Sequence, residues 1–130
     1  MLLDTSGLLC LLHRAEPYHE QACAAYEAAG NRLTTDYVVA ELIALATVRR
    51  LRRQIVLSFV EDLLDTPDVE TVWVDELLHR EALELLAQRQ DKTYSLCDAV
   101  SFVLMRQRNL TEALTTDHHF GQEGFRILLG

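Results

Sequence analysis

Four carboxylates lie in parts of the sequence where hydrophobic folding alone gives no reason for a charge. Asp4 is the single charged residue in residues 1–12, Glu41 in residues 37–48, and Asp98 in residues 93–105. Asp117 directly follows the short run Ala-Leu-Thr-Thr. An ionised carboxylate is costly to remove from water unless a partner compensates its charge, and these runs contain no cation. The pattern therefore predicts a bound metal ion as the compensating partner.

Three of the four acids could simply cap a helix. Asp4 and Asp117 could each cap the segment that follows, and Ser95 and Asp98 have the spacing of a capping box. Glu41 differs, because it is expected inside a helix, beyond capping reach and among apolar neighbours. We therefore expect partial burial of Glu41.

The elements that must position these acids alternate between short apolar runs and longer amphipathic stretches. The expected strands are residues 2–3, 32–34, 69–74, 113–115 and 126–128; the expected helices lie near 6–14, 18–29, 37–50, 52–65, 76–90 and 96–107, with a turn at 118–121. We expect Asp36 to cap the third helix and Gly30-Asn31 to end the second. Strands separated by helices indicate crossover connections. The predicted fold is α/β, an open parallel sheet of about five strands flanked by helices in an α/β/α sandwich.

In such a sheet, ligands bind at the edge where the strands have their carboxyl ends. Asp4 and Asp117 follow expected strands, whereas Glu41 and Asp98 lie near the starts of expected helices. We expect the four carboxylates to meet within about 5 Å, where each pair would repel by about 3 kcal/mol at an effective dielectric of about 20. Such a cluster is stable only when protonated or metal-bound, and oxygen ligands favour Mg²⁺ or Mn²⁺. His118 and His119 are expected to face solvent or substrate.

Length and composition indicate one domain over residues 1–130, with 49% hydrophobic and 25% charged residues. No uncharged run approaches the roughly 20 residues of a spanning helix, and the first residues lack a basic start typical of secretion, so no membrane association is expected. Cys10, Cys23 and Cys97 have no CxxC spacing. They are interpreted as reduced core residues of a cytoplasmic protein.

The formal net charge of −8 argues against broad electrostatic attraction to nucleic acid, although two bound divalent cations would halve it. One basic patch contrasts with this balance and consists of Arg49, Arg50, Arg52 and Arg53. The patch could contact RNA phosphate, an acidic partner or solvent only. The apolar helices expected over residues 37–65 exceed what a small sheet can cover, which predicts a homodimer.

The segments LLDTSGLLCLL, TTDYVVAELIAL, YSLCDAVSFVLM and ALTTDHHFGQEGF resemble the four signature segments of the PIN domain. The short form of the chain is similar to VapC-type ribonuclease toxins. The resemblance implies that Asp4, Glu41, Asp98 and Asp117 are the metal-binding and catalytic acids. It also implies that the hydroxyls of Thr5, Ser6 and Thr116 support them, and that Phe120 and Phe125 pack around the last acid. Cys97 departs from the pattern, since many relatives have Thr there; we expect a change in packing only.

The resemblance further implies Mg²⁺- or Mn²⁺-dependent hydrolysis of RNA phosphodiester bonds and a cognate antitoxin protein as partner. The main alternative is a non-catalytic PIN-like module that binds RNA or protein, and a structure-specific DNA nuclease is another. A haloacid dehalogenase phosphatase needs a second Asp where Ser6 stands. A receiver domain needs a Lys after a late strand, whereas Lys92 precedes a helix.

Overall fold

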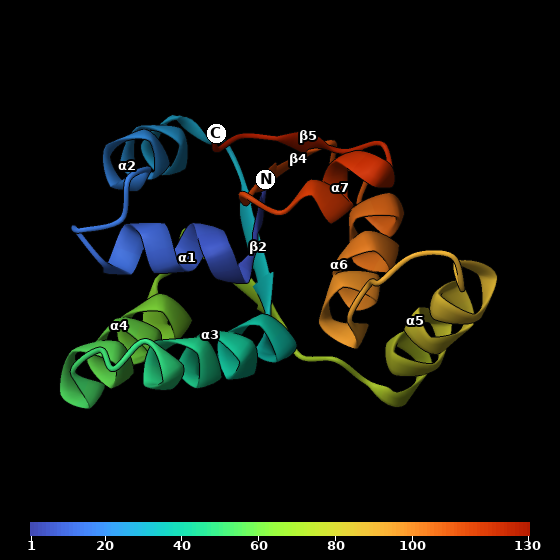
Figure 1. Ribbon diagram of the computed structural model, residues 1–130, viewed down its shortest axis with the longest axis horizontal. Helices are drawn as coiled ribbons and strands as arrows, with labels where there is room; N and C mark the ends of the chain where they lie inside the picture. Colours follow the sequence, from blue (N-terminus) through green and yellow to red (C-terminus); the bar gives the residue numbers. More distant parts are fainter.

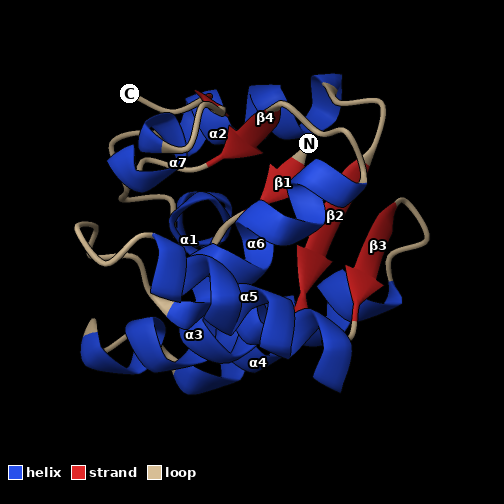
Figure 2. Cartoon of the chain, turned by 90° about the vertical axis from the view of Figure 1, so that its right-hand side faces the viewer, coloured by secondary structure: helices blue, strands red, loops and turns tan.

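The computed structural model describes all of residues 1–130 and contains a five-stranded parallel sheet with the order β3-β2-β1-β4-β5 (Figures 1 and 2). The strands are β1 (Leu2–Leu3), β2 (Arg32–Thr35), β3 (Val69–Val72), β4 (Glu112–Leu114) and β5 (Arg126–Ile127). The helices are α1 (Thr5–Leu12), α2 (His19–Ala28), α3 (Asp36–Val48), α4 (Arg53–Asp65), α5 (Glu76–Gln88), α6 (Leu96–Gln107) and α7 (His118–Gln122). The predicted α/β class and the open parallel sheet are confirmed.

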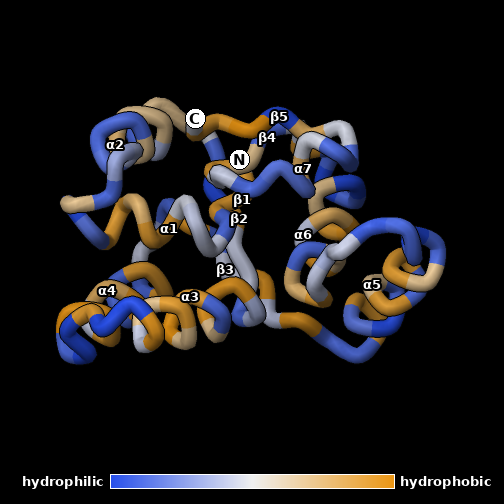
Figure 3. The backbone as a smooth tube through the Cα atoms, viewed as in Figure 1, coloured by the Kyte–Doolittle hydropathy of each residue, from blue (hydrophilic) through white to orange (hydrophobic).

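The helices form two layers, with α1 to α4 on one face of the sheet and α5 to α7 on the other (Figure 1). Side chains alternate along each strand, so Leu3 and Leu114 pack into the cluster beneath α1 to α4, and Leu2 and Ala113 into the other. Figure 3 shows hydrophobic segments of α3 and α4 lying side by side. None of the helices is both long and apolar enough to cross a membrane.

The start of α3 differs from the prediction. Thr35, not Asp36, is the N-cap, and its hydroxyl accepts a hydrogen bond from the Val38 N–H at 3.1 Å. Asp36 is the first helical residue, and its Oδ1 accepts from the Val74 N–H at 2.8 Å. The carboxylate thereby ties the segment after β3 to the start of α3. The end of α2 also comes earlier than expected, at Ala28 instead of next to Gly30.

Gly7 allows α1 to lie directly against the sheet. A Cβ atom at this position would meet the backbone oxygen of Leu114 at 2.0 Å, a distance that no side chain can occupy. Because backbone atoms form the opposing surface, a rotamer change cannot relieve the clash. The close approach brings the first turn of α1 beside the end of β4, where two of the predicted acids lie.

We expect Gly7→Ala to lower the free energy of unfolding by about 3 kcal/mol, at the upper end of typical overpacking costs. Urea unfolding followed by circular dichroism measures the change. The matched control is Gly30→Ala, because nothing lies within 4 Å of the added Cβ there. Equal stability of both variants would contradict the proposed contact.

Candidate metal centre

The four predicted acids lie around the carboxyl edge of the sheet. Asp4 follows β1 and is 4% exposed, whereas Asp98 lies in the first turn of α6 and is 6% exposed. Glu41, in α3, and Asp117, which follows β4, are both partly buried. The expected partial burial of Glu41 is confirmed. The negative charges of Asp98 and Glu41 are close enough to raise the pKa of Asp4.

The strand order explains why these elements meet. From β1 the chain adds β2 and β3 on one side, and then returns to place β4 and β5 on the other. Neighbouring connections therefore leave β1 and β4 in opposite directions, which opens a crevice at their carboxyl ends. The pairing of Leu3 with Leu114 places Asp4 beside Thr115. Asp4 and Asp117 thus flank the crevice.

Asp4 occupies an N-cap position, yet its side chain makes no capping hydrogen bond. Its Oδ2 instead accepts a hydrogen bond from the Thr115 hydroxyl at 2.8 Å. Burial raises the pKa of Asp4 from 3.8 to about 7, against the opposing effect of the hydrogen bonds from Thr115 and the Thr5 backbone. No Lys or Arg pairs with this carboxylate. The capping explanation therefore fails for Asp4.

The hydroxyls of Thr115 and Ser6 form a hydrogen-bond network beside Asp4. With its proton donated to Asp4, Thr115 Oγ1 accepts from the Asp117 N–H at 2.9 Å and from Ser6 Oγ at 3.0 Å. Ser6 Oγ in turn accepts from the Thr116 N–H at 3.0 Å. Thr116 therefore contributes its backbone, while the buried Thr5 hydroxyl has no hydrogen-bond partner. Of the predicted supporting hydroxyls, the structure connects only Ser6 to this network.

Asp98 and Asp117 do have capping roles. The Asp98 Oδ2 accepts from the Ser95 N–H at 3.1 Å and the Ser95 hydroxyl accepts from the Asp98 N–H at 3.0 Å, which completes the predicted capping box. Asp117 Oδ1 accepts from the His119 N–H at 2.9 Å. Capping occupies one oxygen of each carboxylate and leaves the other free for a further partner.

The expectation that all four carboxylates meet within about 5 Å is wrong. No three of their side chains have oxygens within 4.8 Å of one another; the group that meets this limit is Asp117, His118 and His119. Hydrogen bonds from the Thr115 hydroxyl and the Ser95 N–H hold Asp4 and Asp98 at separate places along the crevice. The acids therefore line the crevice instead of forming one tight cluster.

His119 does not face solvent, which is one of the two orientations expected for the histidines. Its Nδ1 lies 3.1 Å from Asp98 Oδ2 and 3.4 Å from Asp117 Oδ1, and its side chain is 15% exposed. The His118 ring, by contrast, is 77% exposed. His119 is thus the residue of this centre to which the sequence patterns assigned no role beside the acids. Thr115 ends the strand expected over residues 113–115, and the pairing of β1 with β4 places it beside Asp4.

Cys97 affects more than packing. Burial raises the pKa of its thiol well above the usual range, and the charges of Glu41, Asp4 and Asp98 raise it further. The thiol of the metal-free protein is therefore protonated beside the acids at neutral pH. All three cysteines are free, and Cys10 and Cys97 are buried, whereas Cys23 is partly exposed.

The predicted basic patch lies at the other end of α3. Glu41 is in the second turn, whereas Arg49 is the C-cap and pairs with Glu16 at 2.6 Å. Arg49 lies eight positions after Glu41, about 12 Å along the helix axis at a rise of about 1.5 Å per residue. The patch consequently does not line the crevice.

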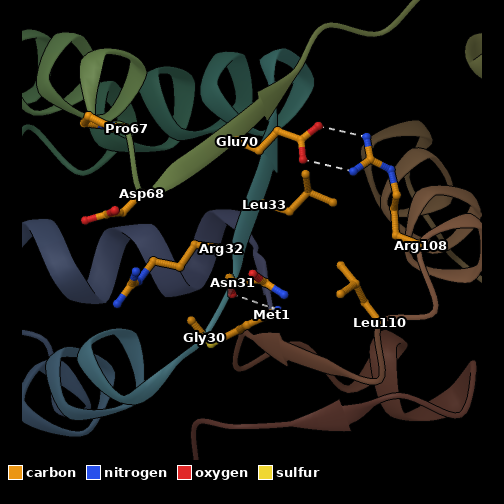
Figure 4. Close-up of a pocket in the computed structure, with 10 residues that line it drawn as sticks. All are labelled: Met1, Gly30, Asn31, Arg32, Leu33, Pro67, Asp68, Glu70, Arg108 and Leu110. Carbon is orange, nitrogen blue, oxygen red and sulfur yellow. Dashed lines mark hydrogen bonds and ion pairs between the residues drawn. The ribbon is translucent and has the colours of Figure 1, made fainter.

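A cavity of about 520 Å³ lies at the opposite, amino edge of the sheet (Figure 4). Its polar walls already bond to one another: Arg108 forms two hydrogen bonds with Glu70, and the amino group of Met1 donates to the Asn31 carbonyl. It contains none of the predicted site residues. We therefore assign the chemistry to the carboxyl edge and not to this cavity.

The residues at the carboxyl edge fit a divalent cation. Asp4 and Glu41 have no cationic partner. The partners of Asp98 and Asp117 are histidines, His119 for both acids and also His118 for Asp117. A buried carboxylate with an elevated pKa gains most from a metal ion, because the ion compensates the charge that burial destabilises. Carboxylate oxygens suit Mg²⁺ and Mn²⁺.

Comparisons with known proteins agree with one another. The family model described as PIN domain matches residues 1–125. Two relatives are named 23S rRNA-specific endonuclease VapC20, one from Mycobacterium tuberculosis strain CDC 1551 / Oshkosh and one from strain ATCC 25618 / H37Rv. Each is 31% identical to this chain over 93 residues, which cover 72% of this chain and 70% of the relative. The crystal structure of Mycobacterium tuberculosis VapC20, described as a sarcin-ricin loop cleaving toxin, matches with a TM-score of 0.90 and 23% identity, covering 99% of this chain and 98% of the other. The structural match shows a shared fold.

The elevated pKa of Asp4 predicts how the stability of the metal-free protein depends on pH. Between the unfolded value of 3.8 and the folded value of about 7, the folded state binds a proton that the unfolded state has released. The contribution of Asp4 to the free energy of unfolding is therefore greatest at pH values below the unfolded-state pKa. It falls as the pH rises to the folded-state pKa and stays constant at higher pH. Urea unfolding in EDTA between these limits, with Asp4→Asn alongside wild type, measures this contribution.

We expect Asp4→Asn to remove this part of the decline, and the exposed Glu61→Gln to retain the wild-type slope. Excess Mn²⁺ should also flatten the wild-type profile, because the ion stabilises the ionised carboxylate. An unchanged slope in Asp4→Asn would show that Asp4 is not the group responsible.

Proposed function

The chain belongs to the PIN domain family, and from this premise we propose that it is a divalent-metal-dependent endoribonuclease of the VapC toxin type. The observation that supports this most strongly is Asp4, a buried carboxylate without a cationic partner at the β1–β4 crevice. Asp98 and Glu41 lie close enough to influence its ionisation. The family membership also confirms the resemblance identified from the sequence motifs and the prediction of a PIN-type nuclease.

We assign Asp4 and Asp98 as the principal metal ligands, and Glu41 and Asp117 to a second ion or to a water molecule. Mg²⁺ or Mn²⁺, when bound, would lower the pKa of a coordinated water and stabilise negative charge on the scissile phosphate. The Thr115 hydroxyl holds the Asp4 carboxylate, and Ser6 holds Thr115. Thr5 and Thr116 contribute backbone groups, the Thr5 backbone to Asp4 and the Thr116 N–H to Ser6. No nucleophilic side chain is required.

The side chains of the crevice hold the carboxylates in fixed directions and form no covalent bond with the substrate. Asp4 and Asp98 enter the crevice from the ends of β1 and the start of α6, each with one oxygen fixed by a protein donor. The fixed oxygens set the direction of the free ones, which reduces the reorganisation needed when charge develops on phosphate. Cys97, protonated beside Glu41, limits the negative charge on this wall of the crevice.

RNA is the proposed substrate, and ribosomal RNA is the first to test, because the relatives that are 31% identical are named for cleavage of 23S rRNA. We propose that residues 1–130 act as one nuclease domain in the cytoplasm, where free thiols persist. A cognate antitoxin protein is the proposed regulatory partner. The patch Arg49, Arg50, Arg52 and Arg53 is assigned to RNA or to acidic groups of that partner, away from the reacting phosphate.

A non-catalytic RNA- or protein-binding module is the competing function. Such a module has no use for buried carboxylates that destabilise the metal-free fold at neutral pH. Binding of Mn²⁺ without any cleavage of RNA would favour it over the nuclease.

We expect Asp4→Asn and Asp98→Asn each to lower kcat/KM for RNA cleavage in Mg²⁺ by about 100-fold or more, because loss of several kcal/mol of charge stabilisation corresponds to such a factor. The measurement is cleavage of a ribosomal RNA fragment under single-turnover conditions, with circular dichroism to verify folding. Glu61→Gln serves as the control and should retain activity. Full activity in Asp98→Asn would overturn the assignment.

A homodimer is proposed because apolar side chains remain exposed on α3 and α4. Val48 is 79% exposed, and Ile55 and Leu57 are also exposed. We expect Ile55→Asp to weaken self-association in sedimentation velocity, because dimerisation would bury the new charge. Leu83→Asp, on the exposed face of α5, is the matched control. A monomeric wild type at all concentrations would refute the dimer.

A further inference from the structure

His119 connects Asp98, in the first turn of α6, with Asp117, the N-cap of α7. Its Nδ1 lies 3.1 Å from Asp98 Oδ2 and 3.4 Å from Asp117 Oδ1. Its backbone N–H also donates to Asp117 Oδ1 at 2.9 Å. One residue therefore contacts both carboxylates on this side of the crevice.

Several neighbours fix the orientation of the His119 ring. Nε2 lies 3.1 Å from the hydroxyl of Thr93, and the ring makes an edge contact with Tyr94 at 5.2 Å between centroids. Tyr94 in turn packs edge-on against the buried Phe102. Because carboxylate oxygens accept hydrogen bonds, Nδ1 is the donor towards Asp98, and Nε2 is left to bond with the Thr93 hydroxyl.

The bond from His119 exceeds what helix capping needs. The Ser95 backbone N–H already donates to Asp98 Oδ2 and completes the capping box. His119 adds a second donor to the same oxygen, whereas Asp98 Oδ1 receives no hydrogen bond from the protein. Two donors on one oxygen fix the plane of the carboxylate and leave the other oxygen available.

We propose that His119 is a positioning residue, whose Nδ1–H holds Asp98 so that its unbonded oxygen faces a metal ion in the crevice. The inference rests on the proposed metal-dependent function. Donors behind a ligating carboxylate commonly set its direction, and their loss typically weakens metal binding by about 10- to 100-fold. His119 thus acts on the ion through Asp98 and does not ligate it.

Three substitutions at this position separate the roles. In His119→Asn the amide nitrogen takes the place of Nδ1, in His119→Gln it takes the place of Nε2, and His119→Ala has no donor. We expect Ala and Gln to weaken Mn²⁺ binding by about 10- to 100-fold, and Asn to restore most of the affinity. Electron paramagnetic resonance of free Mn²⁺ gives the affinity of the intact chain without reference to activity. Gln122→Ala, an exposed change on α7, is the control.

RNA cleavage provides the second measurement. At saturating Mn²⁺, we expect His119→Asn to retain kcat, and His119→Ala to lower kcat with little change in KM for RNA. Equal loss of affinity in Asn, Gln and Ala would overturn the proposal in favour of direct ligation, and wild-type affinity in Ala would exclude any role. If Asp98→Asn abolishes Mn²⁺ binding while His119→Ala leaves the affinity unchanged, the metal centre stands and only the role of His119 fails. No Mn²⁺ binding by wild type would refute both.

Discussion

The buried negative charge of Asp4 is the constraint on which the carboxyl edge of this sheet depends. Neutral groups surround it, chiefly the Thr115 hydroxyl and the Thr5 backbone, and they only partly offset the effect of burial on its pKa. Folding without a cation therefore favours a protonated Asp4 at this position. A bound divalent ion would reverse that preference and favour the ionised carboxylate. Ionised Asp4 therefore destabilises the metal-free fold, and the same carboxylate would bind the ion in the metal-bound fold.

The topology of the sheet determines which residues can donate hydrogen bonds to the Asp4 carboxylate. Reversal of the strand order between β1 and β4 opens the crevice, and the contact between Gly7 and the Leu114 backbone keeps its two sides close. The first helix can approach the sheet because position 7 has no side chain. Donors from one strand consequently serve an acid from the next, as Thr115 does for Asp4.

Much of the fold and of the candidate site followed from sequence patterns. The periodicity of apolar residues indicates which positions are buried, and the ends of the strands indicate where the carboxyl edge of the sheet lies. The strands, the helices and the partial burial of Glu41 agree with those patterns. The role of Asp36 did not follow, since its partner, the Val74 N–H, comes from a segment 38 residues away. The orientation of His119 and the spacing of the carboxylates also depend on tertiary contacts that no local pattern contains. Adjacent histidines look equivalent in sequence, yet only one points inward.

The two hydrophobic clusters meet at the sheet, and the acids come from both sides of it. Glu41 belongs to a helix of the first layer, and Asp98 to a helix of the second. An ion coordinated from both layers would act as a further cross-link between them, in addition to apolar packing and the 2.6 Å hydrogen bond between Tyr37 of α3 and His79 of α5. Cation supply would then contribute to the rigidity of this junction as well as to the chemistry of the crevice.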